Sequence, residues 1–207
     1  MSALLYVLTT ITSPSLTPTT YNTWYDTVHI PELLSIPGSP NAAHRYKSTN
    51  PRNQKWQFLT LYPLNDISFT GDPAIRERVS SHHPVLPGGK SIWELIVFEG
   101  RDYVAVNGGD GKGLQGGKRW IVTVEIGGGE EGMQGLLDGV DGGYARYRIH
   151  RAPTAMAGAN SPEIPVLKEL VIFELDKEED IERLISALQQ TSEPLRINIQ
   201  CSSWESI

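Results

Sequence analysis

The stretch TTYNTWYDTVHIPELLSIPG, from Thr19 to Gly38, decides how the rest of the chain is interpreted. Thr17 can cap a helix that begins here, and Pro18 fits the first helical position, where no amide hydrogen is needed. The pair Pro37-Gly38 is a typical stop signal. These signals predict a helix from Pro18 to Ile36.

A break in this helix falls beside its histidine. Pro31 cannot donate to the carbonyl of Thr27, so the helix should kink or restart next to His29. Residues three and four apart share a helix face, which places Asp26 and Tyr25 near the imidazole. An imidazole can exchange a proton near neutral pH, and a neighbouring carboxylate or phenol can fix its tautomer. His29 is therefore the candidate acid/base, with Tyr25 or Asp26 orienting it. The alternative is an ordinary packed helix.

The strand patterns around this helix follow a repeated order. In the first half, strand, helix, two strands, helix and strand are predicted at residues 4–11, 18–36, 43–48, 56–64, 73–81 and 92–99. The same order recurs at residues 120–126, 130–140, 144–150, 167–175, 178–189 and 195–201. Two βαββαβ units predict an α+β fold, in which two four-stranded antiparallel sheets with outer helices pack into a barrel-like core.

Glycine separates the two halves. Residues 101–118 are too rich in glycine to bury much apolar surface and are expected to form a linker. Residues 1–100 form the first repeat and carry the expected site. Residues 119–207 form a second, degenerate repeat, whose predicted first helix lacks aromatic residues and histidine. Two halves in one chain can pair internally, so we expect a monomer with an internal pseudo-dimer or a homodimer.

Composition narrows the class of partner. The chain has 207 residues and a net charge of -6 without a basic run, which argues against nucleic acid. No apolar run approaches the roughly 20 residues of a membrane helix. A single cysteine, Cys201, suits a reducing compartment, and we expect a cytoplasmic protein. Metal-ligand, serine-hydrolase and phosphate-loop motifs do not occur, so we expect a small-molecule substrate with no metal and no cofactor.

The segment WYDTVHIPELLSIPG resembles a helix of EthD-like proteins in the dimeric α+β barrel superfamily, in particular of its duplicated fungal members. The matching positions are Trp24, Tyr25, His29, Pro31, Leu34, Pro37 and Gly38. The resemblance implies two ferredoxin-like repeats that form a barrel, with a ligand cavity between sheet and helices. It also implies relatives among cofactor-free cyclases, decarboxylases, dehydratases and monooxygenases of aromatic or polyketide compounds, in which a histidine often handles protons.

Further residues are candidates for binding the substrate. His44 and Tyr46 share one face of a strand and could meet His29 if that face borders the cavity; an ordinary sheet pair is the alternative. Apolar walls could come from Trp24, Trp56 and Trp93. Glu94 lies within an apolar strand pattern and could act as a cavity carboxylate. Arg148 shares a strand face with Arg146 and His150 and could hold a substrate carboxylate, unless this is a solvated face.

The sequence therefore predicts a cofactor-independent enzyme of small-molecule, secondary metabolism. It would act on an aromatic or polyketide-derived compound through proton transfer by His29, as a lyase or isomerase that performs decarboxylation, dehydration or cyclisation. One alternative is a non-catalytic small-molecule-binding or oligomeric stress-type protein on the same scaffold. Another is a haem-binding relative with a histidine as axial ligand.

Overall fold

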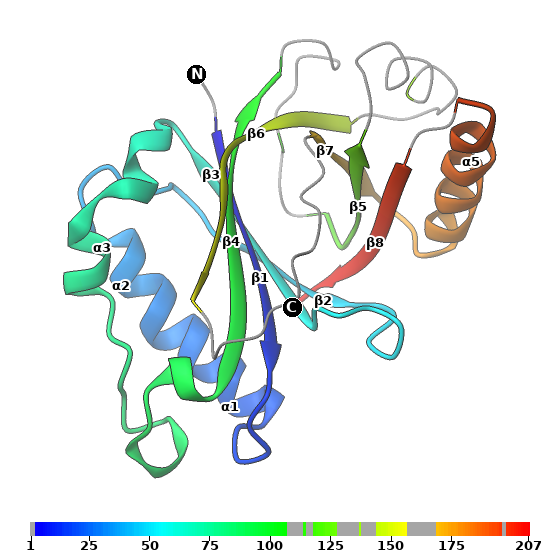
Figure 1. Ribbon diagram of the computed structural model, residues 1–207. Coiled ribbons are helices and arrows are strands. Elements are labelled where there is room, and N and C mark those ends of the chain that lie inside the picture. The colour runs from blue at the N-terminus through cyan, green and yellow to red at the C-terminus, as the bar shows by residue number, and fades with distance from the viewer. Residues whose placement is uncertain are drawn as a thin grey trace.

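The computed structural model describes residues 3–106, 118–127, 144–156, 169–195 and 198–207, with residues 114 and 137. Its strands are Ala3–Ile11 (β1), His44–Ser48 (β2), Phe58–Leu64 (β3), Ile96–Ala105 (β4), Trp120–Gly127 (β5), Tyr144–Met156 (β6), Glu169–Leu175 (β7) and Asn198–Ser206 (β8). They close into one antiparallel barrel in the order β1-β3-β2-β8-β5-β7-β6-β4 (Figure 1). The predicted barrel is thus confirmed, as a single closed sheet.

The two halves of the chain contribute equally to the barrel. The first half supplies the neighbouring strands β4, β1, β3 and β2, and the second half supplies β8, β5, β7 and β6. In each half the spatial order is therefore fourth, first, third and second strand. The halves meet at two antiparallel seams, β4 with β6 and β2 with β8. Strands from both halves consequently surround one shared interior.

One long helix follows β1, as predicted. It consists of α1 (Pro18–Trp24), a π-helical turn η1 (Tyr25–His29) and α2 (Ile30–Leu34). The Thr17 side chain accepts a hydrogen bond from the amide of Thr20 and caps the start. The amide of Ile30 donates to the carbonyl of Tyr25, five residues earlier. The expected break beside His29 is thus a widened turn within a continuous helix.

The end of the first half differs from the prediction. The expected strand at residues 92–99 begins instead with a 3₁₀ turn, η4 (Ile92–Glu94). The amide of Trp93 donates to the Ser91 side chain and the Glu94 carboxylate accepts from the amide of Ser91, a capping box that stabilises the turn. β4 starts at Ile96 and runs to Ala105, so its end occupies residues assigned to the linker.

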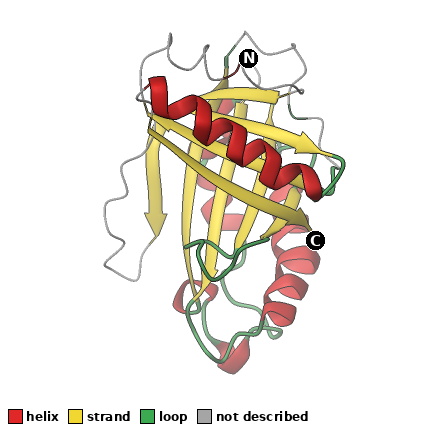
Figure 2. Ribbon diagram, turned by 90° about the vertical axis from the view of Figure 1, so that its right-hand side faces the viewer, coloured by secondary structure: helices red, strands yellow, loops and turns green. Residues whose placement is uncertain are grey.

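The remaining elements are short, apart from one helix. They are η2 (Ile67–Gly71), α3 (Pro73–Arg78), η3 (Pro87–Gly89) and α5 (Glu179–Leu195). Figure 2 shows α5 lying across the outer face of the barrel. The helix expected at residues 130–140 lies outside the described residues, except residue 137. None of the described helices combines the length and the apolar character that a membrane span requires.

Strand alternation divides the buried side chains into three cores. On β1, Leu4, Tyr6 and Leu8 belong to the barrel interior, whereas Ala3 packs beneath the first helix. A third cluster fills the space between α5 and the outer face of the second-half strands. Because neighbouring residues in a strand point to opposite faces, a shift of one position decides which core a side chain enters.

Candidate functional site

The candidate site lies between the first helix and the outer face of the first-half sheet. The half-buried ring of His29 stacks on the Trp24 ring, with centroids 5.0 Å apart and 29° between the planes. The Tyr25 ring lies 4.6 Å from it at 57°. Nδ1 of His29 is buried and has no hydrogen-bond partner among the described residues. An unpaired buried polar atom is costly, so it calls for an explanation.

The surroundings keep this imidazole uncharged. Burial, and after it the positive charge of Arg45, lowers the pKa of His29 from 6.5 to about 4. At neutral pH His29 therefore carries a single ring proton, and its two nitrogens act as one donor and one acceptor. Such a ring can take up a proton from a bound molecule and return it.

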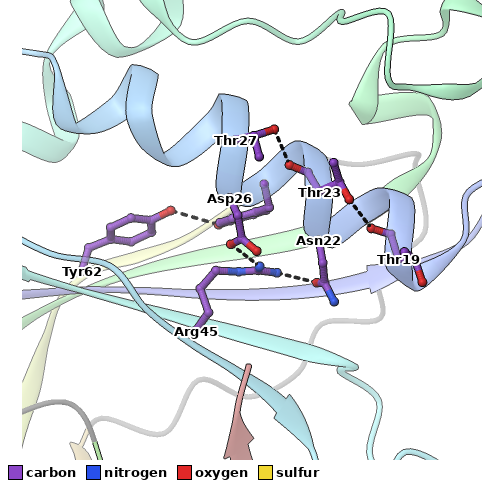
Figure 3. Close-up of polar contacts among 8 residues, drawn as sticks. Thr19, Asn22, Thr23, Asp26, Thr27, Arg45 and Tyr62 are labelled. Atoms are coloured by element: carbon purple, nitrogen blue, oxygen red, sulfur yellow. Dashed lines mark hydrogen bonds and ion pairs between the residues drawn. The ribbon is translucent and has the colours of Figure 1, made fainter.

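Arg45, on β2, joins the sheet to the helix. Its Nη1 donates to the carboxylate of Asp26 at 2.6 Å and its Nη2 donates to Oδ1 of Asn22 at 2.8 Å (Figure 3). The guanidinium carbon lies 4.4 Å from the centroid of the Tyr25 ring, within cation-π range. The side chain is buried, at 4% exposure, whereas that of Asp26 is 53% exposed. The ion pair therefore lies at the rim of the site.

The carboxylate of Asp26, one of the two residues expected to orient His29, is thus paired with Arg45. The expectation assumed α-helical spacing, in which residues three apart share a face. In the π turn, hydrogen bonds join residues five apart, so the turn is wider and Trp24, rather than Asp26, lies beside the imidazole. Asp26 pairs with Arg45, and the charge of Arg45 lowers the pKa of the His29 ring.

Two tyrosines form the polar floor of the site. The hydroxyl of Tyr62, on β3, donates to the hydroxyl of Tyr25 at 3.1 Å (Figure 3). Burial raises the pKa of both phenols, so both stay protonated at neutral pH. Because Tyr62 is the donor, the hydroxyl hydrogen of Tyr25 can serve another acceptor. Tyr25 thus contacts His29 through its ring, and its hydroxyl also has a side-chain hydrogen bond with Thr60.

His44 and Tyr46 do not meet His29. Tyr46 belongs to the barrel interior, and His44 lies two positions away on the same face of β2. Arg45, between them, points to the helix. The sequence predicts that the two residues share a face but leaves open which face it is, because alternation gives the period of a strand and not which face the helix covers.

The three tryptophans proposed as walls lie in different places. Trp24 is buried against His29. Trp56 belongs to the barrel interior, on the other side of the sheet. Trp93 is 36% exposed and packs on Phe98, at 5.0 Å between ring centroids. Only Trp24 of the three borders the imidazole.

The proposed carboxylate and arginine also lie elsewhere. Glu94 is exposed and bonds the amide of Ser91, so it caps a turn and does not enter a cavity. Arg148 and Arg146, on β6, both pair with Glu169 of β7, at 3.0 and 3.1 Å. These ion pairs lie on the outer face of the second-half strands.

Arg45 and Tyr62 are the site residues that sequence reasoning missed. Each sits in a strand between residues that point to the barrel interior, and only the position of the helix reveals their role. Within the described part of the chain, no three His, Cys, Asp or Glu side chains gather as a metal site would require.

Solved structures show the same architecture. A candidate chlorite dismutase matches with a TM-score of 0.60 and 12% identity, covering 100% of this chain and 94% of its own. A variant of the chlorite dismutase of Candidatus Nitrospira defluvii gives 0.57 and 10%, over 99% and 91% of the two chains. A candidate monooxygenase of Fusobacterium nucleatum gives 0.53 and 7% with the same coverage. The chain has the dimeric α+β barrel fold. At these identities the likeness concerns the fold alone.

One curated relative carries sequence similarity. Core atranone cluster protein 1 of Stachybotrys chlorohalonatus is 34% identical over 124 residues, which are 59% of this chain and 52% of that protein. The chain therefore spans about half the length of this relative. No known protein-family profile matches the chain.

Proposed function

We propose that the protein is a cofactor-independent enzyme that moves a proton on an aromatic or polyketide-derived small molecule, with His29 as the acid/base. One observation carries the proposal: Nδ1 of His29, at a π turn, is buried and has no hydrogen-bond partner in the described part of the chain. Such turns occur often at functional sites, and the unpaired atom is explained if a ligand completes it. Decarboxylation, dehydration and cyclisation are the reaction classes that this chemistry suits.

The neighbouring residues have separate roles in this proposal. The neutral imidazole accepts the proton, and the Tyr25 hydroxyl, which would exchange its contact with Thr60 for the ligand, donates to the oxygen on which negative charge develops. The indole of Trp24 stacks on the imidazole of His29 and fixes its orientation. A ligand carboxylate or enolate near Arg45 would oppose the positive charge that now lowers the pKa of His29. Ligand binding would then raise this pKa towards neutrality, where proton transfer is most effective.

The relative and the strand order support the metabolic role, the family and the oligomeric state that we propose. A relative that belongs by name to the core atranone cluster favours a role in secondary metabolism. The helix motif and the matching strand orders of the two halves favour a duplicated EthD-like protein built from two ferredoxin-like repeats. One chain closes the barrel by itself, which favours a monomer with an internal pseudo-dimer over a homodimer. A cytoplasmic location is part of the proposal.

A ligand screen separates the enzyme from its alternatives. The purified protein is incubated with a panel of aromatic and polyketide-derived acids, alcohols and ketones, and bound and free compounds are identified by mass spectrometry. A new product that forms with the wild type and with His82→Ala, but not with His29→Ala, supports the enzyme. His82 is a suitable control because it lies exposed in a loop. A bound compound that returns unchanged would favour a carrier, and a Soret band would favour a haem protein.

A further inference from the structure

The two seams that join the halves are unequal. β4 and β6 are paired at seven positions, with register shifts around Asp102, whereas β2 and β8 are paired only from Tyr46 to Ser48, opposite Trp204 to Ser206. The last contact along this seam is the hydrogen bond from the amide of Thr49 to the carbonyl of Ser203, at 3.2 Å. Among the described strands, residues 198–202 of β8 pair with β5 alone. The barrel wall is therefore open beside this part of β8.

A cavity of about 530 Å³ occupies this opening, and we call it the seam cavity. This volume is in the usual range for small-molecule sites. Its inner part is lined by side chains of the barrel interior and of the loop after β2, among them Tyr6, Leu8, Trp56, Glu125 and Trp204. Since these side chains lie inside the barrel, the sheet separates the seam cavity from His29.

Buried charge lies at the inner end of the seam cavity. Oε2 of Glu125 lies 2.6 Å from Nη1 of Arg101 but has no hydrogen bond of good geometry in the described structure. Nε of Arg101 donates to Glu99 at 2.5 Å. The three residues are between 2% and 7% exposed. Among the described side chains, two carboxylates thus face one guanidinium, and the surplus negative charge of this group would be balanced by a cation.

Aromatic rings line the seam cavity near this charge. Nζ of Lys55 lies 4.4 Å from the centroid of the Trp56 ring, so the chain itself places an ammonium on an aromatic face at the mouth. Deeper in the barrel, Tyr6 and Trp204 both donate to Oγ1 of Thr123, at 3.3 and 3.0 Å, which fixes their rings. Aromatic faces combined with excess negative charge are the usual means of binding organic ammonium ions.

We propose that the seam cavity is a binding site for a small organic cation, an alkylamine or a quaternary ammonium compound. The ammonium group approaches the Glu125 carboxylate, and its alkyl substituents contact Trp56 and Trp204. This site does not involve His29, so the proposal of a cation site does not depend on the proposed reaction.

Calorimetric titration with choline tests the proposal. Choline is compared with 3,3-dimethyl-1-butanol, which has the same shape and no charge. We expect choline to bind at least about tenfold more tightly, in keeping with charge-assisted contacts at a buried site. Equal binding of the two compounds, or no choline binding at all, would overturn the proposal. The His29→Ala variant should bind choline as the wild type does.

Substitutions locate the bound cation. Glu125→Gln should weaken choline binding at least about tenfold because it removes the charge and keeps the shape. The matched control is Glu169→Gln, which alters a carboxylate that is also 5% exposed and paired with arginine, but on the outer face of the sheet. It should change the affinity less than about twofold, within the usual limit for distant sites. Equal losses in both variants would contradict the assignment.

A second variant keeps the test decisive if Glu125→Gln does not fold. Lys55→Ala removes the ammonium that now occupies the Trp56 ring and does not touch the buried charges. Choline should then bind about two- to fivefold more tightly, the size expected for one exposed cation-π contact. Unchanged or weaker binding by this variant would show that Trp56 is not part of the site.

Discussion

The imidazole of His29 stacks on the indole of Trp24, five residues earlier in the same helix, with ring centroids 5.0 Å apart. This contact follows from the π turn between residues 25 and 29, because a wider turn brings residues five apart to the same side of the helix. The stack holds the ring with Nδ1 buried beside the Tyr25 ring. The geometry of the candidate site thus depends on one irregular turn.

The stability of the fold should depend on pH through His29. Its pKa is about 4 in the folded chain and near 6.5 when unfolded, so between these values only the unfolded chain binds the proton. The full contribution of the uncharged His29 to the free energy of unfolding should be present above pH 6.5. It should fall by about 3 kcal/mol as the pH drops to 4. Urea unfolding at pH 7 and at pH 4.5 measures the difference in the free energy of unfolding. This difference should be smaller in the His29→Gln variant. A titration of the His29 ring signals near pH 6.5 by NMR would contradict this prediction.

Replacing Arg45 should raise the pKa of His29. The Arg45→Gln variant removes a buried positive charge that now disfavours the imidazolium, while burial continues to act on the ring. NMR titration of the His29 ring signals measures the change. Lys47→Gln is the control, since Lys47 lies two positions along the strand and pairs with Glu205 at the surface. A pKa that moves equally in both variants, or stays near 4 in Arg45→Gln, would rule out the proposed influence of Arg45.

The order of strands and the first helix were predictable because their signals are local. Caps, prolines and β-branched runs lie within a few residues of the structure that they determine, as Thr17 and Pro18 do. The face of a strand is different, because it depends on where distant elements pack. The sequence therefore leaves open whether His44 and Tyr46 or Arg45 face the first helix, and the structure places Arg45 there.

Other parts of the site depend on details that residue spacing does not encode. The π turn changes which residues meet, so the predicted contact of Asp26 with His29 is replaced by the contact with Arg45. Glu94 looks like a strand residue by its apolar neighbours, yet Ser91 makes it a turn cap. The unequal seams between β2 and β8 and between β4 and β6 join segments far apart in sequence, so no local pattern could predict the seam cavity.

The bond between the two phenols should contribute modestly to stability. Tyr62→Phe removes the donor to Tyr25 and leaves the ring in place. We expect a loss of about 1 kcal/mol in the free energy of unfolding, the usual net value for one buried hydrogen bond. Tyr144→Phe, on a ring that packs against Phe173 in the second half, is the comparison and should cost less. A larger loss from Tyr144→Phe would mean that the phenol pair is not a stabilising contact.

Removing the positive charge of Arg101 from the barrel interior should lower the free energy of unfolding strongly. Arg101→Met leaves two buried carboxylates, Glu99 and Glu125, without their cation. The expected loss of stability is about 3–5 kcal/mol, as for other buried ion pairs that lose one partner. Arg119→Met breaks an ion pair with Glu205 in which the arginine is 68% exposed, and should cost at most about 1 kcal/mol. Similar unfolding midpoints for the two variants would contradict the role given to Arg101.

If His29 carries the proton, its removal should slow the turnover of any compound that the protein converts. We predict that kcat for His29→Ala falls by about 10²-fold or more, the usual size of general acid/base effects, while His82→Ala keeps the wild-type value. Circular dichroism establishes that both variants are folded. A folded His29→Ala variant with unchanged kcat would contradict the account.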